Sequence, residues 1–115
     1  MQKKVAEFNI KKNVHKTPMP VYARLLDIQS EIGELAKEYL KHSSYGTSEF
    51  ELNDDFILEY GDVLYSFLSL ANELNIDSKF ALDKVINKYK ARIEKHGSMG
   101  SEKNKNEIIK DILCK

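Results

Sequence analysis

The sequence has little of what turn-rich β folds, disulfide-stabilised domains and membrane proteins need. Two prolines and five glycines stand against 42% hydrophobic and 31% charged residues, a balance that favours long helices. The one cysteine, Cys114, cannot form an internal disulfide, so nothing indicates an oxidising compartment. No apolar run approaches the ~20 residues that span a bilayer, and no signal-peptide pattern opens the chain. We therefore expect one soluble, cytoplasmic domain with no membrane partner.

The 115 residues carry no net charge, but the charges are segregated. Residues 1–16 hold five lysines against Glu7, residues 27–62 hold ten acids against two lysines, and residues 84–95 hold five basic residues against Glu94. A neutral chain with an acidic middle is not expected to bind nucleic acid. The segregation suits a site where a metal and an anionic substrate meet, and it equally suits ordinary solvated helix faces.

Apolar periodicity predicts an all-α fold, a bundle of about four helices with a short helical tail. The helices are expected over residues 2–14, 20–42, 54–74 and 79–95. We assign residues 1–97 to the domain and residues 98–115 to a polar linker and a short C-terminal helix.

Capping signals mark the ends of these helices. Asn53 or Asp54 is expected to cap the third helix, and Asp77 or Ser78 the fourth. Gly97 is well placed to end the fourth helix.

The third helix is apolar around most of its circumference, which is typical of a buried helix at the centre of a bundle. Three short neighbours cannot cover it, so we expect a homodimer or a homotetramer. One narrow polar stripe interrupts the apolar surface: Asp55, Glu59, Asp62, Ser66, Ser69 and Glu73.

Two acidic pairs, Glu31/Glu34 and Glu59/Asp62, are spaced i, i+3 on the second and third helices. Residues at this spacing project from nearly the same face, so each pair offers two carboxylates together. If the two helices pack with these faces together, four carboxylates converge and require a cation. The pairs thus predict a hard divalent metal site. The second helix alone favours a solvent-exposed acidic face instead, because its acids form a stripe opposite its apolar side: Asp27, Glu31, Glu34 and Glu38.

Taken together, SEIGELA (residues 30–36) and EYGDVL (residues 59–64), with 24 residues between Glu34 and Glu59, resemble the motif of the MazG-like nucleotide pyrophosphohydrolases. The flanking sequences EIGELAKE and EYGDVLYSFLSLANELNID also resemble the usual sequence pattern of the family, and so does the later basic stretch NKYKAR (residues 87–92). The resemblance covers roughly residues 18–96.

The resemblance implies an all-α enzyme that cleaves a nucleoside triphosphate between the α and β phosphates, giving the monophosphate and pyrophosphate. It implies Mg²⁺, with Mn²⁺ as an alternative, as the cofactor. It assigns Lys88 and Arg92 to binding the substrate phosphates. The metal ligands it implies are Glu31, Glu34, Glu59 and Asp62.

Ser30 departs from the family pattern, which often has a further glutamate at this position. The number of metal ions and the base that activates water therefore stay open. We favour Glu31 or Glu34 as the catalytic base or its orienter, with Glu38 and Asp27 as substitutes.

None of the three histidines follows a glutamate by three residues, so the Glu-x-x-His pattern of di-iron bundles is missing and they are not predicted as metal ligands. His15 is a candidate for a base pocket with Phe8. The alternatives are a relative of the dimeric dUTPases or phosphoribosyl-ATP pyrophosphatases, or a catalytically silent helical interaction module.

Overall fold

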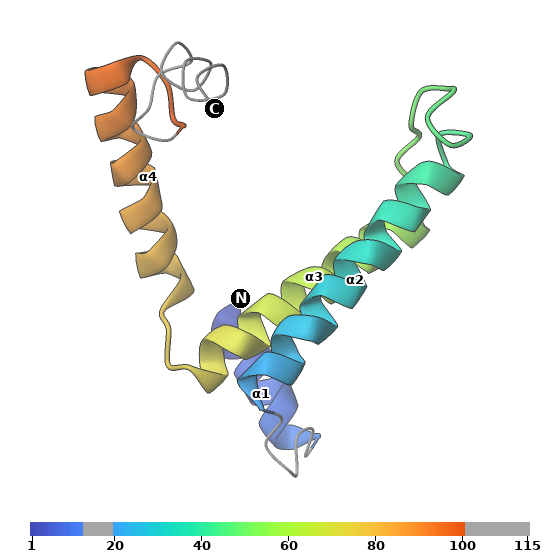
Figure 1. Ribbon diagram of the computed structural model, residues 1–115. Coiled ribbons are helices and arrows are strands. Elements are labelled where there is room, and N and C mark those ends of the chain that lie inside the picture. The colour runs from blue at the N-terminus through green and yellow to red at the C-terminus, as the bar shows by residue number, and fades with distance from the viewer. Residues whose placement is uncertain (13–19, 101–115) are drawn as a thin grey trace, which may run out of the picture. The chain divides into compact units, whose positions relative to one another are not determined.

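The protein is all-α, as predicted. A computed structural model describes residues 1–12 and 20–100, and within them the chain forms four helices and no strands (Figure 1). The helices are α1 (Gln2–Lys11), α2 (Val21–Lys41), α3 (Asp54–Glu73) and α4 (Ser78–His96). In the described part of the chain, no helix is both long and apolar enough to cross a membrane.

The helices divide into two compact units. The first unit, Met1–Asp77, contains α1, α2 and α3, and the second begins at Ser78 and contains α4. Each is described by itself below.

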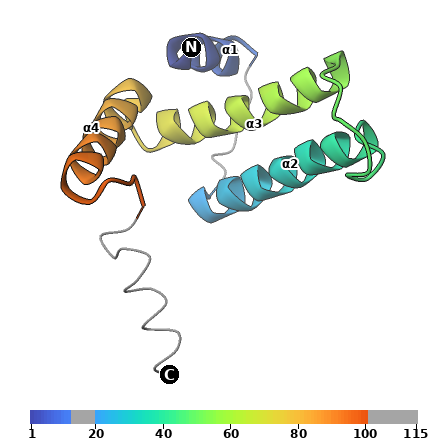
Figure 2. The same cartoon turned by 90° about the horizontal axis from the view of Figure 1, so that it is seen from above.

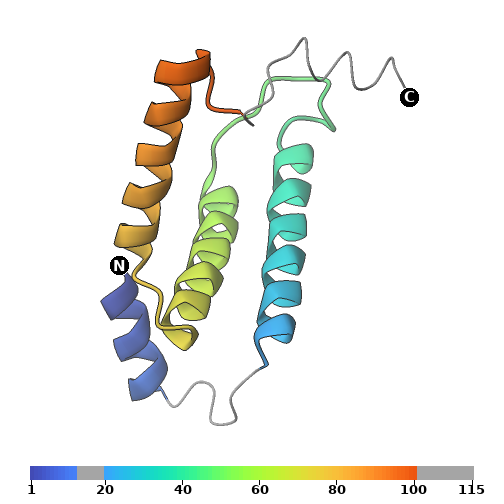
Figure 3. The same ribbon diagram turned by 60° about the vertical axis from the view of Figure 1, so that its left-hand side comes forward.

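In the first unit, α2 and α3 form an antiparallel helical hairpin (Figures 1 and 3). Arg24 near the start of α2 bonds Glu73 at the end of α3, while Asp27 accepts a hydrogen bond from Ser66 one to two turns earlier in α3. Later residues of α2 therefore lie opposite earlier residues of α3, as in an antiparallel pair. This pairing brings the middle of α2 opposite the first half of α3.

α1 packs against the C-terminal half of α3 (Figure 2). The Tyr65 hydroxyl donates to the Asn9 side-chain oxygen, and the Asn9 amide donates to the Ser69 hydroxyl at 3.3 Å. The ring of Phe8 meets that of Tyr65 edge to face, with the centroids 6.2 Å apart. α1 thus covers a side of α3 that α2 leaves free.

The connection between α2 and α3 closes over three aromatic rings. Phe50 stacks on Tyr39 of α2 at 4.7 Å between centroids and meets Phe56 of α3 edge to face at 4.8 Å. Such pairs stabilise a hairpin end beyond the area that they bury. The loop tip uses left-handed backbone at Ser44, Tyr45 and Gly46.

The predicted helix ends agree with the structure at two positions that can be compared. Asn53 is the N-cap of α3, and its side-chain oxygen accepts a hydrogen bond from the Phe56 backbone N–H at 2.9 Å. Gly97 adopts a left-handed φ of 74° just after α4, which is the conformation that a terminating glycine supplies.

α1 is shorter than the predicted helix over residues 2–14, because Lys12 already leaves helical geometry, with φ −92° and ψ 3°. Residues 13–19 and 101–115 lie outside the described part, and with them His15, Cys114 and the predicted C-terminal helix.

The described residues of the single chain do not bury α3 nearly all round, so its central position in a bundle stays a prediction that depends on a second copy of the chain. Leu58 is 68% exposed and Tyr60 58% exposed, whereas Ser66 and Ser69 of the polar stripe are buried. The reason is that α2 packs on the polar stripe of α3, so part of the apolar circumference is left without cover from the described residues of this chain.

Candidate metal centre

The seam between α2 and α3 includes several buried or half-buried polar side chains. Arg24 is 3% exposed, and its guanidinium donates to the Glu73 carboxylate at 2.9 Å and lies 3.7 Å from the Asp27 carboxylate. Ser66, which donates to Asp27 at 3.5 Å, is buried between the helices. Ile28, the residue after Asp27 in α2, is buried as well, at 4% exposure, so polar and apolar side chains are both covered at this level of the hairpin.

Further along this seam, three acids of the two predicted pairs come together. Glu31 of α2 and Glu59 and Asp62 of α3 each place a carboxylate oxygen within 4.8 Å of the others. Glu31 and Glu59 are half-buried, while Asp62 is exposed. The acidic stripe that the second helix alone would turn toward solvent therefore faces α3 at Glu31.

Glu34, the fourth acid of the predicted set, lies at the margin. It is exposed and is not one of the three that converge, and its carboxylate lies 3.5 Å from the Lys37 ammonium. It remains close enough to contribute to the electrostatic repulsion on Glu31 and Glu59.

Partial burial and mutual repulsion both disfavour the charged carboxylates of the cluster. Partial burial raises the pKa of Glu31 above its usual 4.5, and the neighbouring carboxylates Asp62 and Asp27 raise it further. Partial burial likewise raises the pKa of Glu59, with Asp62 the largest of the added charges. Both groups thus hold protons more tightly than a free glutamate does.

Within residues 1–12 and 20–100, no ion pair involves the three acids of the cluster. Two cations of α2, Arg24 and Lys37, pair with other acids: Asp27, Glu73 and Glu34. A cation supplied from outside would relieve the repulsion.

The donor set fits Mg²⁺ or Mn²⁺. It consists of carboxylate oxygens, which hard divalent ions prefer. Mg²⁺ binds oxygen at about 2.1 Å, so oxygens on opposite sides of one ion lie about 4.2 Å apart; the three oxygens of the cluster lie within 4.8 Å of one another, which is compatible with one shared ion. The residues present therefore match the group that the sequence motif implies.

The predicted phosphate-binding residues belong to the second unit. On α4, Lys88 is exposed with its ammonium 5.3 Å from the centroid of the Tyr89 ring, and Arg92 is half-buried and donates to the Met99 carbonyl at 3.2 Å. They lie one turn apart and can act together on one anion.

Reasoning from the sequence missed Arg24 and the group of Glu38, His42 and Asp55 farther along the seam. The i, i+4 spacing of Glu38 and His42 was a signal for the second omission, because it places a carboxylate and an imidazole on one helix face. Only the pairing of α2 with α3 adds Asp55.

A comparison with known proteins found a relative in Bacillus subtilis. The chain is 35% identical over 79 residues to the uncharacterized protein YpjD of Bacillus subtilis (strain 168), a match that takes in 66% of this chain and 67% of that protein. No protein-family model matches the chain, and no solved structure does.

Proposed function

We propose that this chain, which belongs to the same family as Bacillus subtilis YpjD, is a Mg²⁺-dependent nucleotide pyrophosphohydrolase of the MazG-like kind. Its substrates are ribo- or deoxyribonucleoside triphosphates. The bond between the α and β phosphates breaks, and the products are the nucleoside monophosphate and pyrophosphate.

One observation carries the proposal: Glu31, Glu59 and Asp62 converge across the α2–α3 seam without a basic partner among the described residues. A protein gains nothing in stability from three carboxylates held together, and the raised pKa values of Glu31 and Glu59 reflect that cost. Arrangements that cost stability are typical of functional sites.

Each acid has a role in the proposed reaction. Glu31, Glu59 and Asp62 hold Mg²⁺, and Glu34, on the same face of α2 as Glu31, completes the set from the exposed margin. Bound there, Mg²⁺ supplies neutralisation of phosphate charge and orientation of a water. Water adds its oxygen to phosphorus, the P–O bond to pyrophosphate breaks, and the water proton goes to Glu31 or Glu34.

Two basic residues of α4 bind the triphosphate in this proposal. Arg92 offers a planar fork that can donate two hydrogen bonds to one phosphate, and Lys88 adds a point charge one turn away.

A nucleotide panel tests the reaction. The purified chain is incubated with each NTP and dNTP with and without Mg²⁺, and pyrophosphate, orthophosphate and nucleoside monophosphate are measured separately. We expect Mg²⁺-dependent pyrophosphate release that falls by at least about 100-fold in Glu59→Gln and Asp62→Asn, because each removes a charged ligand. Glu49→Gln, an exposed acid of the loop, is the matched control and keeps full activity.

The panel also separates the alternatives. With dUTP and phosphoribosyl-ATP added to the panel, turnover of dUTP alone would assign a dUTPase-like enzyme, and turnover of phosphoribosyl-ATP alone would assign a phosphoribosyl-ATP pyrophosphatase. Orthophosphate as the first product rejects α–β cleavage. If no nucleotide turns over and Mg²⁺ leaves the melting temperature unchanged, the chain is a silent interaction module.

A further inference from the structure

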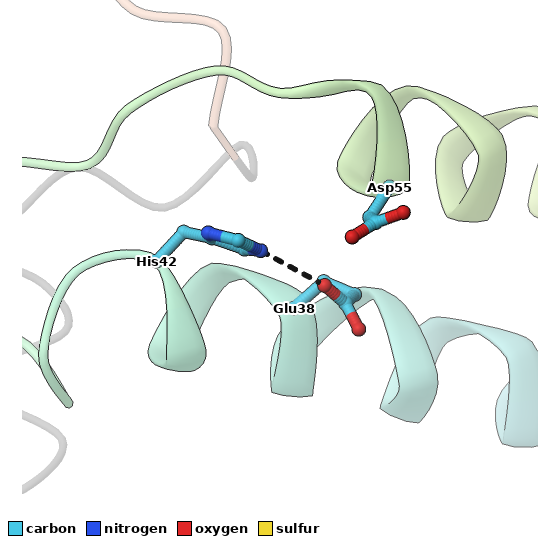
Figure 4. Close-up of side chains that lie close together, drawn as sticks. All are labelled: Glu38, His42 and Asp55. Atoms are coloured by element: carbon cyan, nitrogen blue, oxygen red, sulfur yellow. Dashed lines mark ion pairs between the residues drawn. The ribbon is translucent and has the colours of Figure 1, made fainter.

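Beyond the converging carboxylates, the hairpin seam holds a second group of potential metal ligands. Glu38, His42 and Asp55 each place one ligand atom within 4.8 Å of the others (Figure 4). The Nε2 atom of His42 lies 3.3 Å from the Oε2 atom of Glu38. In Figure 4 the imidazole ring and the two carboxylates point toward one another from the ends of two helices.

The local structure fixes the three positions. His42 is the C-cap residue of α2, and Glu38 lies four residues earlier on the same face. Asp55 comes from the first turn of α3, which begins after the Asn53 cap. The aromatic contacts of Phe50 with Tyr39 and Phe56 hold these two helix ends side by side.

Two buried polar atoms of this group lack a hydrogen bond. His42 Nε2 and Glu38 Oε2 are fully shielded from solvent and, although near each other, form no hydrogen bond in the structure. Buried polar atoms almost always have a hydrogen-bonding or coordinating partner. An i, i+4 ion pair explains why the two side chains are close, but it explains neither the missing hydrogen bond nor a second carboxylate facing the first.

We propose that Glu38, His42 and Asp55 form a second metal site, for a first-row transition ion of the Zn²⁺ type. An imidazole nitrogen with two carboxylate oxygens suits Zn²⁺, whereas Mg²⁺ favours oxygen ligands alone. Three protein ligands leave a position for water or for a fourth group. The ligand chemistry therefore separates this site from the all-carboxylate cluster.

The position of the site gives it a consequence for stability. An ion bound there joins the last turn of α2 to the first turn of α3, at the loop end of the hairpin. Binding to the folded chain alone raises its melting temperature by mass action. The inference does not rest on the proposed enzymatic activity, and an inactive protein would still carry the site.

Co²⁺ is the spectroscopic probe and Zn²⁺ the competitor. Co²⁺ is titrated into the full chain in the presence of excess Mg²⁺, which occupies the all-oxygen cluster, and visible absorption is recorded. We expect one Co²⁺ bound with nitrogen and oxygen ligation, displaced by one equivalent of Zn²⁺ but not by Mg²⁺. Zn²⁺ should also raise the melting temperature.

Variants assign the signal. His42→Gln and Asp55→Asn should each weaken Co²⁺ and Zn²⁺ binding by more than about tenfold and abolish the rise in melting temperature. Glu31→Gln and His96→Gln, an exposed histidine at the end of α4, should leave both unchanged. Asp55 is exposed, so Asp55→Asn keeps the fold even if His42→Gln does not; circular dichroism without metal checks this.

Three results would overturn the site. The first is Co²⁺ binding that is unchanged in both His42→Gln and Asp55→Asn. The second is loss of the Co²⁺ absorption when more Mg²⁺ is added. A sulfur charge-transfer band would assign the ion to Cys114 instead.

Discussion

At the scale of single residues, charges are balanced at one position along the α2–α3 seam and unbalanced at another. At one level Arg24 is buried against Glu73 and Asp27, so its charge is compensated by the chain itself. At the next level, Glu31, Glu59 and Asp62 meet with no such compensation. The contrast marks the uncompensated level as the one that needs a ligand.

Removing one carboxylate should stabilise the metal-free protein. Because folding raises the pKa of Glu59, its ionised form costs stability at neutral pH, and Glu59→Gln removes that cost. We expect a higher melting temperature than wild type in EDTA, and a smaller rise on adding Mg²⁺. Differential scanning fluorimetry measures both, with Glu49→Gln as control; a lower melting temperature for Glu59→Gln in EDTA would contradict the prediction.

The stabilising effect of Mg²⁺ should depend on pH. The folded-state pKa values of Glu31 and Glu59 lie above the ordinary 4.5, so the folded chain takes up protons in the window just above 4.5. As pH falls through that window, the metal-free protein loses its repulsive penalty and protons compete with Mg²⁺ for the carboxylates.

The Mg²⁺-induced rise in melting temperature should therefore shrink at a higher pH than the titration of a free carboxylate would give. Melting curves with Mg²⁺ and with EDTA, recorded from neutral pH to pH 4.5, provide the measurement. A rise that stays constant down to pH 4.5 would argue against binding at Glu31 and Glu59.

At the scale of helices, spacing in the sequence predicted which residues share a face but not which face meets which neighbour. The i, i+3 pairs placed Glu59 and Asp62 together, and the structure adds Glu31 from the other helix. Glu34 is not part of the cluster because only one line of residues along α2 faces α3, and Glu34 lies beside that line. His42 was not predicted as a ligand because it does not follow a glutamate by three residues, and Asp55, 13 positions away, comes near it only in the folded hairpin.

Helix ends were the most predictable local feature, since they depend on neighbouring residues alone. Asn53 was one of two predicted caps for α3, and its side chain accepts the Phe56 N–H as a cap does. The length of α1 was less predictable, because apolar spacing continues past Lys12, where the helix has already ended.

Loss of this cap should destabilise the fold. Asn53→Ala leaves the Phe56 N–H without its side-chain partner and should cost about 1 kcal/mol of unfolding free energy. Asn53→Ser, which can also accept this hydrogen bond, should recover most of it. Urea denaturation followed by circular dichroism measures the difference, and equal stability of Asn53→Ala and wild type would show that the cap contributes nothing.

At the scale of the whole molecule, the hairpin exposes many large apolar side chains on both of its helices. Exposed residues of α3 include Leu58, Ile57 and Tyr60, and those of α2 include Tyr22 and Leu26. Large apolar side chains gathered on two helices are typical of a surface that binds another protein. A second copy of the chain is the partner that the sequence already predicts, as a homodimer or homotetramer.

A charge on the exposed face of α3 should separate the copies. Leu58 is 68% exposed in the single chain, so Leu58→Asp leaves the packing of the isolated hairpin intact but would bury an unpaired carboxylate at an interface between copies. We expect light scattering coupled to size-exclusion chromatography to give a dimer or tetramer for wild type and a smaller species for Leu58→Asp. Leu52→Asp, equally exposed but in the loop, is the control and should keep the wild-type mass. Because the helical content of Leu58→Asp should be unchanged, a mass equal to that of wild type would show that this face is not the interface.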